Sequence, residues 1–181
     1  MNIVRFYEGS IVEDPDKEYE LFNKVITSDC EQEYYKEVGK KKTLIEIQED
    51  KIKESKSLLE TYLNEHPLLS SVKNNVEKYY TCTKDKQNQL VQTLSLYNLS
   101  IQSNTKYKCM WNSMGQPCEE WTIDELTILS FQMQSYVYPF IRYQQDIEVK
   151  IMECKNKEEV EMIEIDYAKV GVSNDEENYD E

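Results

Sequence analysis

The residue types that carry out most enzymatic chemistry are scarce in this sequence. Its single histidine, His66, precedes Pro67 where a helix is expected to end, and a partial positive charge there complements the helix dipole. No glycine-rich phosphate loop, Gly-x-Ser-x-Gly elbow or His-Glu-x-x-His pair occurs, and the chain has only 4 glycines. We therefore expect a protein that is not an enzyme, and the missing motifs argue most strongly against nucleotide enzymes.

Carboxylates are plentiful, but their spacing does not suit a catalytic or metal-binding set. The adjacent pairs Glu119-Glu120 and Glu158-Glu159 would point in different directions on a helix instead of converging on one bond. The acidic run at residues 175–181 lacks the alternating ligands and the turn glycine of a calcium-binding EF-hand loop. We expect neither a metal ion nor any other cofactor.

The 5 cysteines are an odd number without repeated close spacing. Neither a disulfide framework nor a zinc knuckle is indicated, so reduced thiols are expected. Cys109 and Cys118 flank a predicted hairpin turn and could face each other across it. A bond between them stays open, and the simpler interpretation is two small, half-buried apolar residues.

The charge of the chain limits its partners. A formal net charge of −14 argues against nucleic acid and anionic membrane surfaces, because phosphate binding relies on clustered Lys and Arg. No apolar run approaches the roughly 20 residues that span a bilayer. The N-terminus also lacks a basic region followed by a hydrophobic segment, so we expect a protein that is neither transmembrane nor secreted by a signal peptide.

The composition predicts a mainly α (α+β) fold. A hydrophobic fraction of 39% and a charged fraction of 31% suit a thin helical protein, and 4 Gly with 4 Pro are too few for the turns of a sandwich or barrel. We expect a helical hairpin or bundle with a long C-terminal helix. A small β-hairpin between helices and a short N-terminal β element complete the prediction.

The first segment, residues 1–42, is predicted to hold a β element and a linker, and it is a candidate attachment segment. A β-prone run at residues 2–7 precedes a turn at Glu8-Gly9-Ser10 and a second short run at Ile11-Val12. Between Glu13 and Lys42 the apolar residues are sparse and irregular, which predicts a connecting region with one short helix.

The next segment, residues 43–66, is predicted to form an amphipathic helix. Thr43-Leu44-Ile45-Glu46 has the form of a capping box, in which the Thr and Glu side chains satisfy backbone N–H groups of the first turn. Ile45, Ile52 and Leu59 then recur every seven residues. A stripe this narrow buries little apolar surface by itself. It therefore needs a second helix to cover it, from this chain or from another copy.

Residues 67–167 are predicted to form a helical domain with an inserted hairpin. A strand candidate at residues 78–82 leads to a helix that begins at Thr83, its N-cap, and stops at Ser103-Asn104. A strand at residues 107–111 enters a turn at Gly115 and returns to Trp121. A short helix follows Asn156, and residues 168–181 are predicted to be an acidic, flexible tail.

The best-defined element is one long helix that begins at Thr122 and ends near Cys154. Residues 122–125 repeat the capping-box pattern, and Trp121 can pack onto Leu126 in the first turn. The helix would be about 45 Å long at 1.5 Å per residue, with a kink at Pro139. Its first half, residues 126–136, is expected to build the core with the helix from Thr83. Its second half, residues 140–151, is expected to extend beyond that core toward a partner.

The 14 tyrosines combine a large apolar area with a polar tip, which suits thin helical cores and protein interfaces alike. Packing on the helix from Thr83 is the simpler interpretation for those around Pro139, yet the same region is the first place to look for an interface. The candidate interface residues, taken from both amphipathic helices, are Tyr136, Tyr138, Phe140, Tyr143, Ile147, Ile151, Ile45, Ile52 and Leu59.

About half of the chain, from Tyr79 to Tyr167, resembles small proteins encoded beside tail-fibre and baseplate genes in phages and prophages of Gram-positive bacteria. The resemblance lies in the order of short matches, which are Tyr80-Thr81-Cys82-Thr83, Lys86-Gln87-Asn88, Leu96-Tyr97, Tyr107 to Trp111-Asn112, Glu120-Trp121-Thr122, Glu125-Leu126, Tyr143-Gln144-Gln145, Glu159-Val160 and Ile165-Asp166-Tyr167. It implies a place in a phage-type tail or in its assembly, and it carries over no active-site residue.

Two functions are therefore expected, in order. The first is a structural or chaperone-like assembly component that binds a tail fibre or baseplate subunit, located in the virion tail or in the host cytoplasm during assembly. The second is an acidic cytoplasmic adaptor or inhibitor that binds a basic host protein. In both the partner is a protein, and self-association of this chain is left open.

Overall fold

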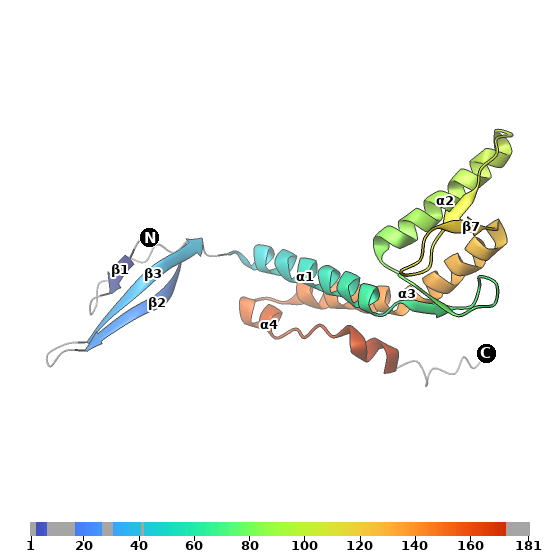
Figure 1. The fold of residues 1–181 in the computed structure, drawn as a ribbon. Coiled ribbons are helices and arrows are strands. Elements are labelled where there is room, and N and C mark those ends of the chain that lie inside the picture. Colours follow the sequence, from blue (N-terminus) through green and yellow to red (C-terminus); the bar gives the residue numbers. More distant parts are fainter. Residues whose placement is uncertain (1–2, 7–16, 27–30, 41, 173–181) are drawn as a thin grey trace. The chain divides into compact units, whose positions relative to one another are not determined.

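The computed structural model describes residues 3–6, 17–26, 31–40 and 42–172, and confirms a mainly α fold with some β structure (Figure 1). The chain divides into two compact units, residues 1–49 and residues 50–181. The division falls inside the first helix, α1 (Leu44–Glu65).

The first unit holds a three-stranded antiparallel sheet in the order β1-β3-β2. Its strands are β1 (Ile3–Phe6), β2 (Lys17–Ile26) and β3 (Glu31–Lys40). β1 confirms the predicted N-terminal strand, whereas the connecting region with one short helix is wrong, because β2 and β3 occupy most of residues 13–42. The predicted turn at residues 8–10 and the run at Ile11-Val12 lie outside the described residues.

The β2–β3 ladder explains why its strands were missed. Its register shifts twice, between Glu18 and Tyr19 and again between Leu21 and Asn23. Such irregularities interrupt the two-residue alternation by which a half-buried strand is recognised in a sequence. Backbone hydrogen bonds hold the ladder whatever the side chains are, so charged residues need not prevent it.

The capping box predicted at the start of α1 is present. The Thr43 N–H donates to Glu46 Oε2 at 2.8 Å, and the Glu46 N–H donates to Thr43 Oγ1 at 3.3 Å. The helix ends at Glu65, two residues before Pro67. Proline has no backbone N–H to continue the helical hydrogen bonds, and it disfavours the helical conformation in the residue before it, so a helix end is favoured here.

The described part of the second unit continues through two hairpins, three further α-helices and one 3-10 helix. Its elements are β4 (Leu68–Ser70), β5 (Lys78–Tyr80), α2 (Lys84–Gln102), β6 (Cys109–Trp111), β7 (Glu119–Trp121), α3 (Ile123–Glu153), α4 (Lys157–Glu161) and the 3-10 helix η1 (Tyr167–Val172). β4 pairs with β5 and β6 pairs with β7, each antiparallel. β4 was not expected from the sequence. The prediction of a flexible tail from residue 168 is wrong for residues 168–172, which belong to η1. Residues 173–181 lie outside the described residues.

The long helix begins and ends as predicted. Thr122 and Glu125 form a capping box, and Cys154 is the C-cap. The helix runs unbroken through Pro139, and in Figure 1 its two halves point in different directions. A proline inside a helix removes one backbone hydrogen bond, which accounts for a change of direction there.

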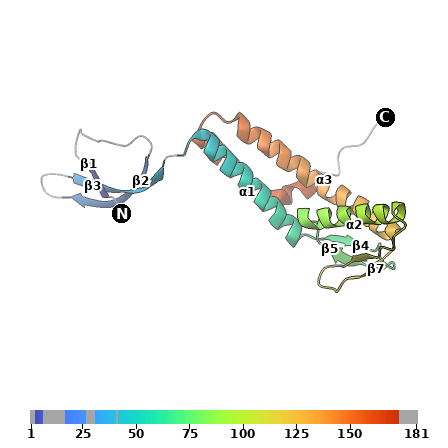
Figure 2. The same cartoon turned by 90° about the horizontal axis from the view of Figure 1, so that it is seen from above.

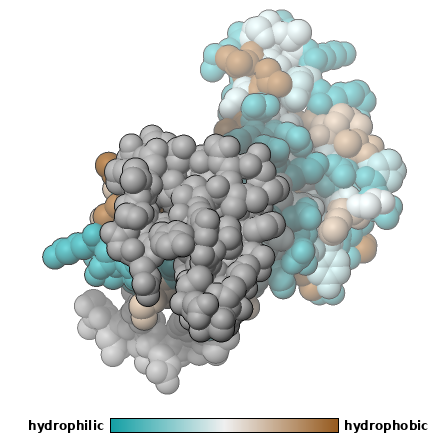
Figure 3. All heavy atoms as spheres, turned by 90° about the vertical axis from the view of Figure 1, so that its left-hand side faces the viewer, coloured by the Kyte–Doolittle hydropathy of each residue, from teal (hydrophilic) through white to brown (hydrophobic). Residues whose placement is uncertain are grey.

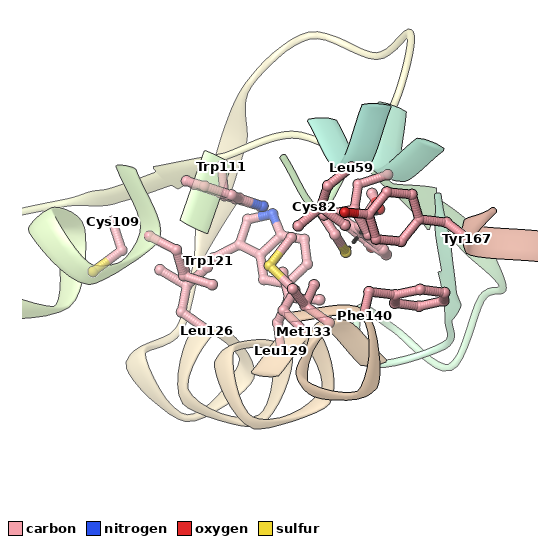
Figure 4. Close-up of a cluster of buried hydrophobic side chains, with 14 residues drawn as sticks. Leu59, Cys82, Cys109, Trp111, Trp121, Leu126, Leu129, Met133, Phe140 and Tyr167 are labelled. Carbon is pink, nitrogen blue, oxygen red and sulfur yellow. Dashed lines mark hydrogen bonds between the residues drawn. The ribbon is translucent and has the colours of Figure 1, made fainter. Parts of the chain in front are cut away.

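The core lies on one face of α3, which we call the inner stripe. In Figure 4 the side chains of Leu126, Leu129 and Met133 point from α3 toward Trp121. Side chains from α1, β5, α2, β6 and β7 cover this face, and α2 packs on the first half of α3 as predicted. The inner stripe consists of Leu126, Leu129, Met133, Val137, Phe140, Gln144, Ile147 and Ile151, all buried.

The start of α2 is completed by a residue that the sequence did not suggest. Thr83 is the N-cap, but its side chain makes no capping hydrogen bond. The Lys84 N–H instead donates to the carboxylate of Glu60 on α1, at 3.3 Å from Oε1 and 3.1 Å from Oε2. A carboxylate at this end satisfies an unpaired N–H and also complements the positive end of the helix dipole.

Replacing Glu60 with alanine should lower the free energy of unfolding by about 1 kcal/mol, because the first turn of α2 loses an acceptor and a favourable charge. Thr83→Ala is the matched control and should lower it by less than half as much, since no capping bond is lost. Urea unfolding of both variants measures the difference. An equal or larger loss for Thr83→Ala would contradict the assignment.

Candidate interaction surface

Most candidate interface residues in the second half of α3 face the interior of the chain. Phe140, Ile147 and Ile151 are 7%, 3% and 0% exposed. The prediction that they form a partner-facing surface is therefore wrong in this structure. The second half of α3 does not extend beyond the folded unit, because α1 lies alongside it in both ribbon views (Figures 1 and 2).

Tyr136 joins the end of α1 to α3. Its hydroxyl donates to the carbonyl oxygen of His66 at 2.7 Å. Its ring centroid is 5.7 Å from that of Phe140, which lies 5.1 Å from that of Tyr62 on α1. Burial, and then the nearby Tyr62 and Cys82, raise the pKa of Tyr136. The residue satisfies a backbone carbonyl beyond the last turn of α1 and is half-buried.

The ring of His66 is held at the end of α1 by two contacts with Tyr62. Its ring stacks on Tyr62 with centroids 4.1 Å apart, and its Nδ1 lies 2.9 Å from the carbonyl oxygen of Tyr62. A carbonyl can only accept, so Nδ1 carries the proton in this contact. Stacking and hydrogen bonding fix the ring at the end of α1.

Tyr143 and Tyr167 connect α3, η1 and α1. The Tyr143 hydroxyl accepts from the Asp166 N–H at 3.3 Å, and its ring meets that of Tyr167 edge-on at 5.4 Å. The Tyr167 hydroxyl donates to the carbonyl oxygen of Ser55 at 3.0 Å, and the Gln144 side-chain amide donates to Ser55 Oγ at 3.4 Å. Ser55 is 0% exposed, so this polar junction lies within the unit. Burial is the main cause that raises the pKa of Tyr167 well above its ordinary value.

The seven-residue stripe of α1 passes from solvent into the core. Ile45 is 65% exposed, Ile52 is half-buried, and Leu59 is 8% exposed within the hydrophobic core. For Leu59 the covering partner is therefore this chain itself, and its assignment to an external interface is corrected.

Tyr138 is the candidate on α3 that the structure places on the surface, at 58% exposure. It belongs to a second apolar stripe on the other side of the helix, which also contains Ile128, Phe131, Val149 and Met152. Only one apolar stripe was predicted for this helix, so these four residues were not among the candidates. The signal that could have revealed them is the three-residue spacing of Ile128 to Phe131 and of Val149 to Met152, with Tyr138 seven residues after Phe131.

A second apolar surface is a cavity of about 270 Å³ beside β5, which we call the β5 cavity. It is lined by Lys78, Tyr79, Ser113, Met114 and Gln116. Tyr79 and Met114 are 54% and 53% exposed, although both are large apolar side chains. The Met114 N–H donates to the Tyr79 carbonyl at 2.8 Å, which holds the turn against the strand.

Buried polar groups of the two hairpins lack hydrogen-bond partners within the described residues. They are the hydroxyls of Tyr80 and Ser113 and the indole N–H groups of Trp111 and Trp121. Figure 4 shows the ring nitrogens of Trp111 and Trp121 turned toward each other. An unsatisfied buried polar group costs about 1–3 kcal/mol. Apolar packing must therefore stabilise the two hairpins by more than the cost of these unsatisfied groups.

A nearly buried ion pair fixes the hairpins to the start of α3. The Lys73 ammonium donates to the Glu120 carbonyl and to Glu125 Oε2, both at 2.9 Å, and lies 5.1 Å from the centre of the Trp121 ring. Burial alone would raise the pKa of Glu125, but hydrogen bonds from Thr122 and Lys73 outweigh it, so this pKa is lowered. Glu125 thus serves the capping box and the loop before β5 together.

Two of the thiols that the structure describes, Cys82 and Cys109, are buried. Cys82, Cys109, Cys118 and Cys154 are free, and β6–β7 pairing sets Cys109 opposite Trp121, so no disulfide joins Cys109 to Cys118. Burial raises the pKa of Cys82 to about 11 and also raises that of Cys109. A raised pKa keeps a thiol protonated and unreactive.

Within the described residues, no group of three or more His, Cys, Asp or Glu side chains is placed to hold a metal ion. Across the same part of the chain, no helix has the length and apolar character that a bilayer crossing demands. The chain matches no protein-family model, no curated protein and no solved structure.

Tyr167→Phe should lower the free energy of unfolding at neutral pH by about 1 kcal/mol, because the Ser55 carbonyl loses its donor. The raised pKa adds a pH dependence. The folded pKa lies above the ordinary 10.0, so the stabilisation is fully present below pH 10.0 and is lost as the pH rises through the folded value.

Urea midpoints measured from about pH 8 to about pH 11 should therefore fall less steeply for Tyr167→Phe than for the unchanged protein. The control is Tyr138→Phe at an exposed site, which should match the unchanged protein within about 0.5 kcal/mol. Parallel pH profiles for the unchanged protein and Tyr167→Phe would refute the role of the buried hydroxyl.

Proposed function

We propose that this protein acts by binding other proteins, as a structural or assembly component of a phage tail or phage-tail-like particle. The resemblance of residues 79–167 to tail-associated proteins suggests the setting. The β5 cavity supports the mode of action, since it is a preformed hollow whose lining includes two large, exposed apolar side chains on a strongly charged chain. The partner is a tail fibre or baseplate subunit.

The lining of the β5 cavity has the features of a binding hot spot. Large side chains such as Tyr79 and Met114 contribute most to affinity where a partner covers them and excludes water. The Lys78–Glu119 ion pair at 3.2 Å, partly exposed, lies beside them and supplies a polar border. An apolar centre with a polar rim is the usual arrangement of a protein interface.

Recognition at this cavity depends on side chains. One edge of β5 pairs with β4, and the Tyr79 carbonyl already accepts from the Met114 N–H. A partner strand therefore finds little free backbone to pair with at Tyr79. Insertion of an apolar side chain of the partner into the cavity is the mode that remains.

The turn that forms one wall of the cavity is held in place before any partner binds. Asn112 donates from its side chain to the carbonyls of Ser113 and Gln116, at 3.2 and 3.3 Å, and accepts from Lys86 at 3.4 Å. Gly115 completes the turn at φ +70°, where an L side chain would be strained. A preformed wall reduces the entropy lost on binding.

Copurification tests the function itself. A fixed ratio of this chain in purified particles identifies a structural subunit. Detection only in lysates, together with unassembled fibre, identifies an assembly chaperone. Absence from both refutes the proposal.

The double variant Tyr79→Ala with Met114→Ala should weaken capture of the tail fibre or baseplate subunit at least about tenfold, a change of roughly 1.4 kcal/mol. Both side chains are exposed, so urea unfolding should change little. Met162→Ala is the matched control, since this methionine is 84% exposed at the end of α4, away from the residues that line the cavity. Equal capture by all three proteins would show that the β5 cavity is not the binding site.

The second candidate is an acidic adaptor or inhibitor that binds a basic host protein, which the net charge of −14 favours. On the face drawn in Figure 3, hydrophilic residues dominate the coloured surface and hydrophobic ones form small groups. Binding through charge should weaken sharply as the ionic strength rises, whereas binding through the β5 cavity should not. The salt dependence of capture therefore separates the two candidates.

A further inference from the structure

The outer face of α3 carries an apolar stripe that the core does not use. Ile128, Phe131, Tyr138, Val149 and Met152 are 50%, 70%, 58%, 57% and 60% exposed. With the polar residues between them they follow the alternating three- and four-residue spacing of a coiled-coil seam. This outer stripe consists of Ile128, Phe131, Ser135, Tyr138, Arg142, Gln145, Val149 and Met152.

The outer stripe lies on the face of α3 opposite the inner stripe. At 100° per residue, the middle of the outer stripe is roughly 150° around the helix from the middle of the inner one. The exposed side chains therefore cannot join the core without displacing it. The stripe also contains no Asp or Glu, although 35 of the 181 residues are acidic. Without carboxylates on this face, two copies can approach each other there without repulsion between acidic side chains.

The stripe is complementary to itself when reversed. If two copies of α3 run antiparallel, Ile128 meets Met152 and Phe131 meets Val149 of the other copy. In the same register Ser135 meets Gln145, so polar residues face each other, and apolar residues face apolar ones. The two halves of the stripe thus match across a two-fold axis, as an interface between identical subunits requires.

The charge in the stripe selects the antiparallel direction. In that register Arg142 lies against Tyr138 of the other copy, where a guanidinium can stack on the aromatic ring. In a parallel pair Arg142 would face Arg142, and like charges would repel at the centre of the seam. A reversed second copy therefore fits the stripe better than a parallel one.

We propose that a second copy of this chain docks antiparallel on the outer stripe of α3. Ile128 and Met152 are separated by about 36 Å measured along the helix, which changes direction at Pro139 between them (Figure 1). Its apolar side chains present roughly 500 Å² per copy, at about 100 Å² each, against about 800 Å² per partner in a standard interface. An area below the standard is typical of weak, transient association. This docking is independent of the β5 cavity, whose residues belong to other elements.

Sedimentation equilibrium of the full chain from about 1 to 200 μM tests the proposal, with a micromolar monomer–dimer transition expected. Phe131→Lys should weaken the dimer at least tenfold, and so should Val149→Glu. Met162→Glu, at an exposed methionine outside the stripe, should not. All these positions are more than half exposed, and urea unfolding checks that each variant is folded.

Combining Phe131→Lys with Val149→Glu distinguishes the register. In the antiparallel dimer each new lysine faces a new glutamate, so the double variant should recover affinity relative to either single variant. Failure to recover, after both single variants have weakened the dimer, overturns the antiparallel register. A monomer at every concentration, or a dimer indifferent to Phe131→Lys, overturns the proposal and leaves partner binding at the β5 cavity unaffected.

Discussion

The inner stripe of α3 must be kept from water, and most of the second unit is arranged to do so. Leu59 and Leu63 cover it from α1, Leu90 from α2, and Trp111 and Trp121 from the second hairpin. Two-stranded hairpins such as β4–β5 and β6–β7 are marginal alone, so their position against this helix is what makes them stable. The stability of the unit therefore depends on one helix more than on any single sheet.

Polar contacts between distant residues complete the ends of these elements. The hydroxyl of Tyr136 reaches the carbonyl of His66, and the hydroxyl of Tyr167 reaches that of Ser55. Lys73 reaches the Glu120 carbonyl on β7 in the same way. Each side chain belongs to a different element from the backbone group it satisfies, so local segments become complete only when the unit is assembled.

Features with a local cause could be predicted from the sequence, and features with a distant cause could not. The capping boxes at Thr43 and Thr122 depend on residues three apart, and both formed where expected. The acceptor for the start of α2 is Glu60, 24 positions before Lys84, and no local pattern indicates it. For the candidate site, periodicity identified apolar faces but not what covers them. Phe140 and Tyr138 are two residues apart, and one is buried while the other is exposed.

The contact between Glu60 and Lys84 has a consequence for the β5 cavity. It closes a loop whose ends are 24 residues apart, and that loop contains β4, β5 and the cavity residues Lys78 and Tyr79. Closing a loop restricts the conformations of everything inside it. The first turn of α2 and one wall of the cavity therefore belong to one closed loop, so separating α1 from α2 would remove a constraint on the position of β5.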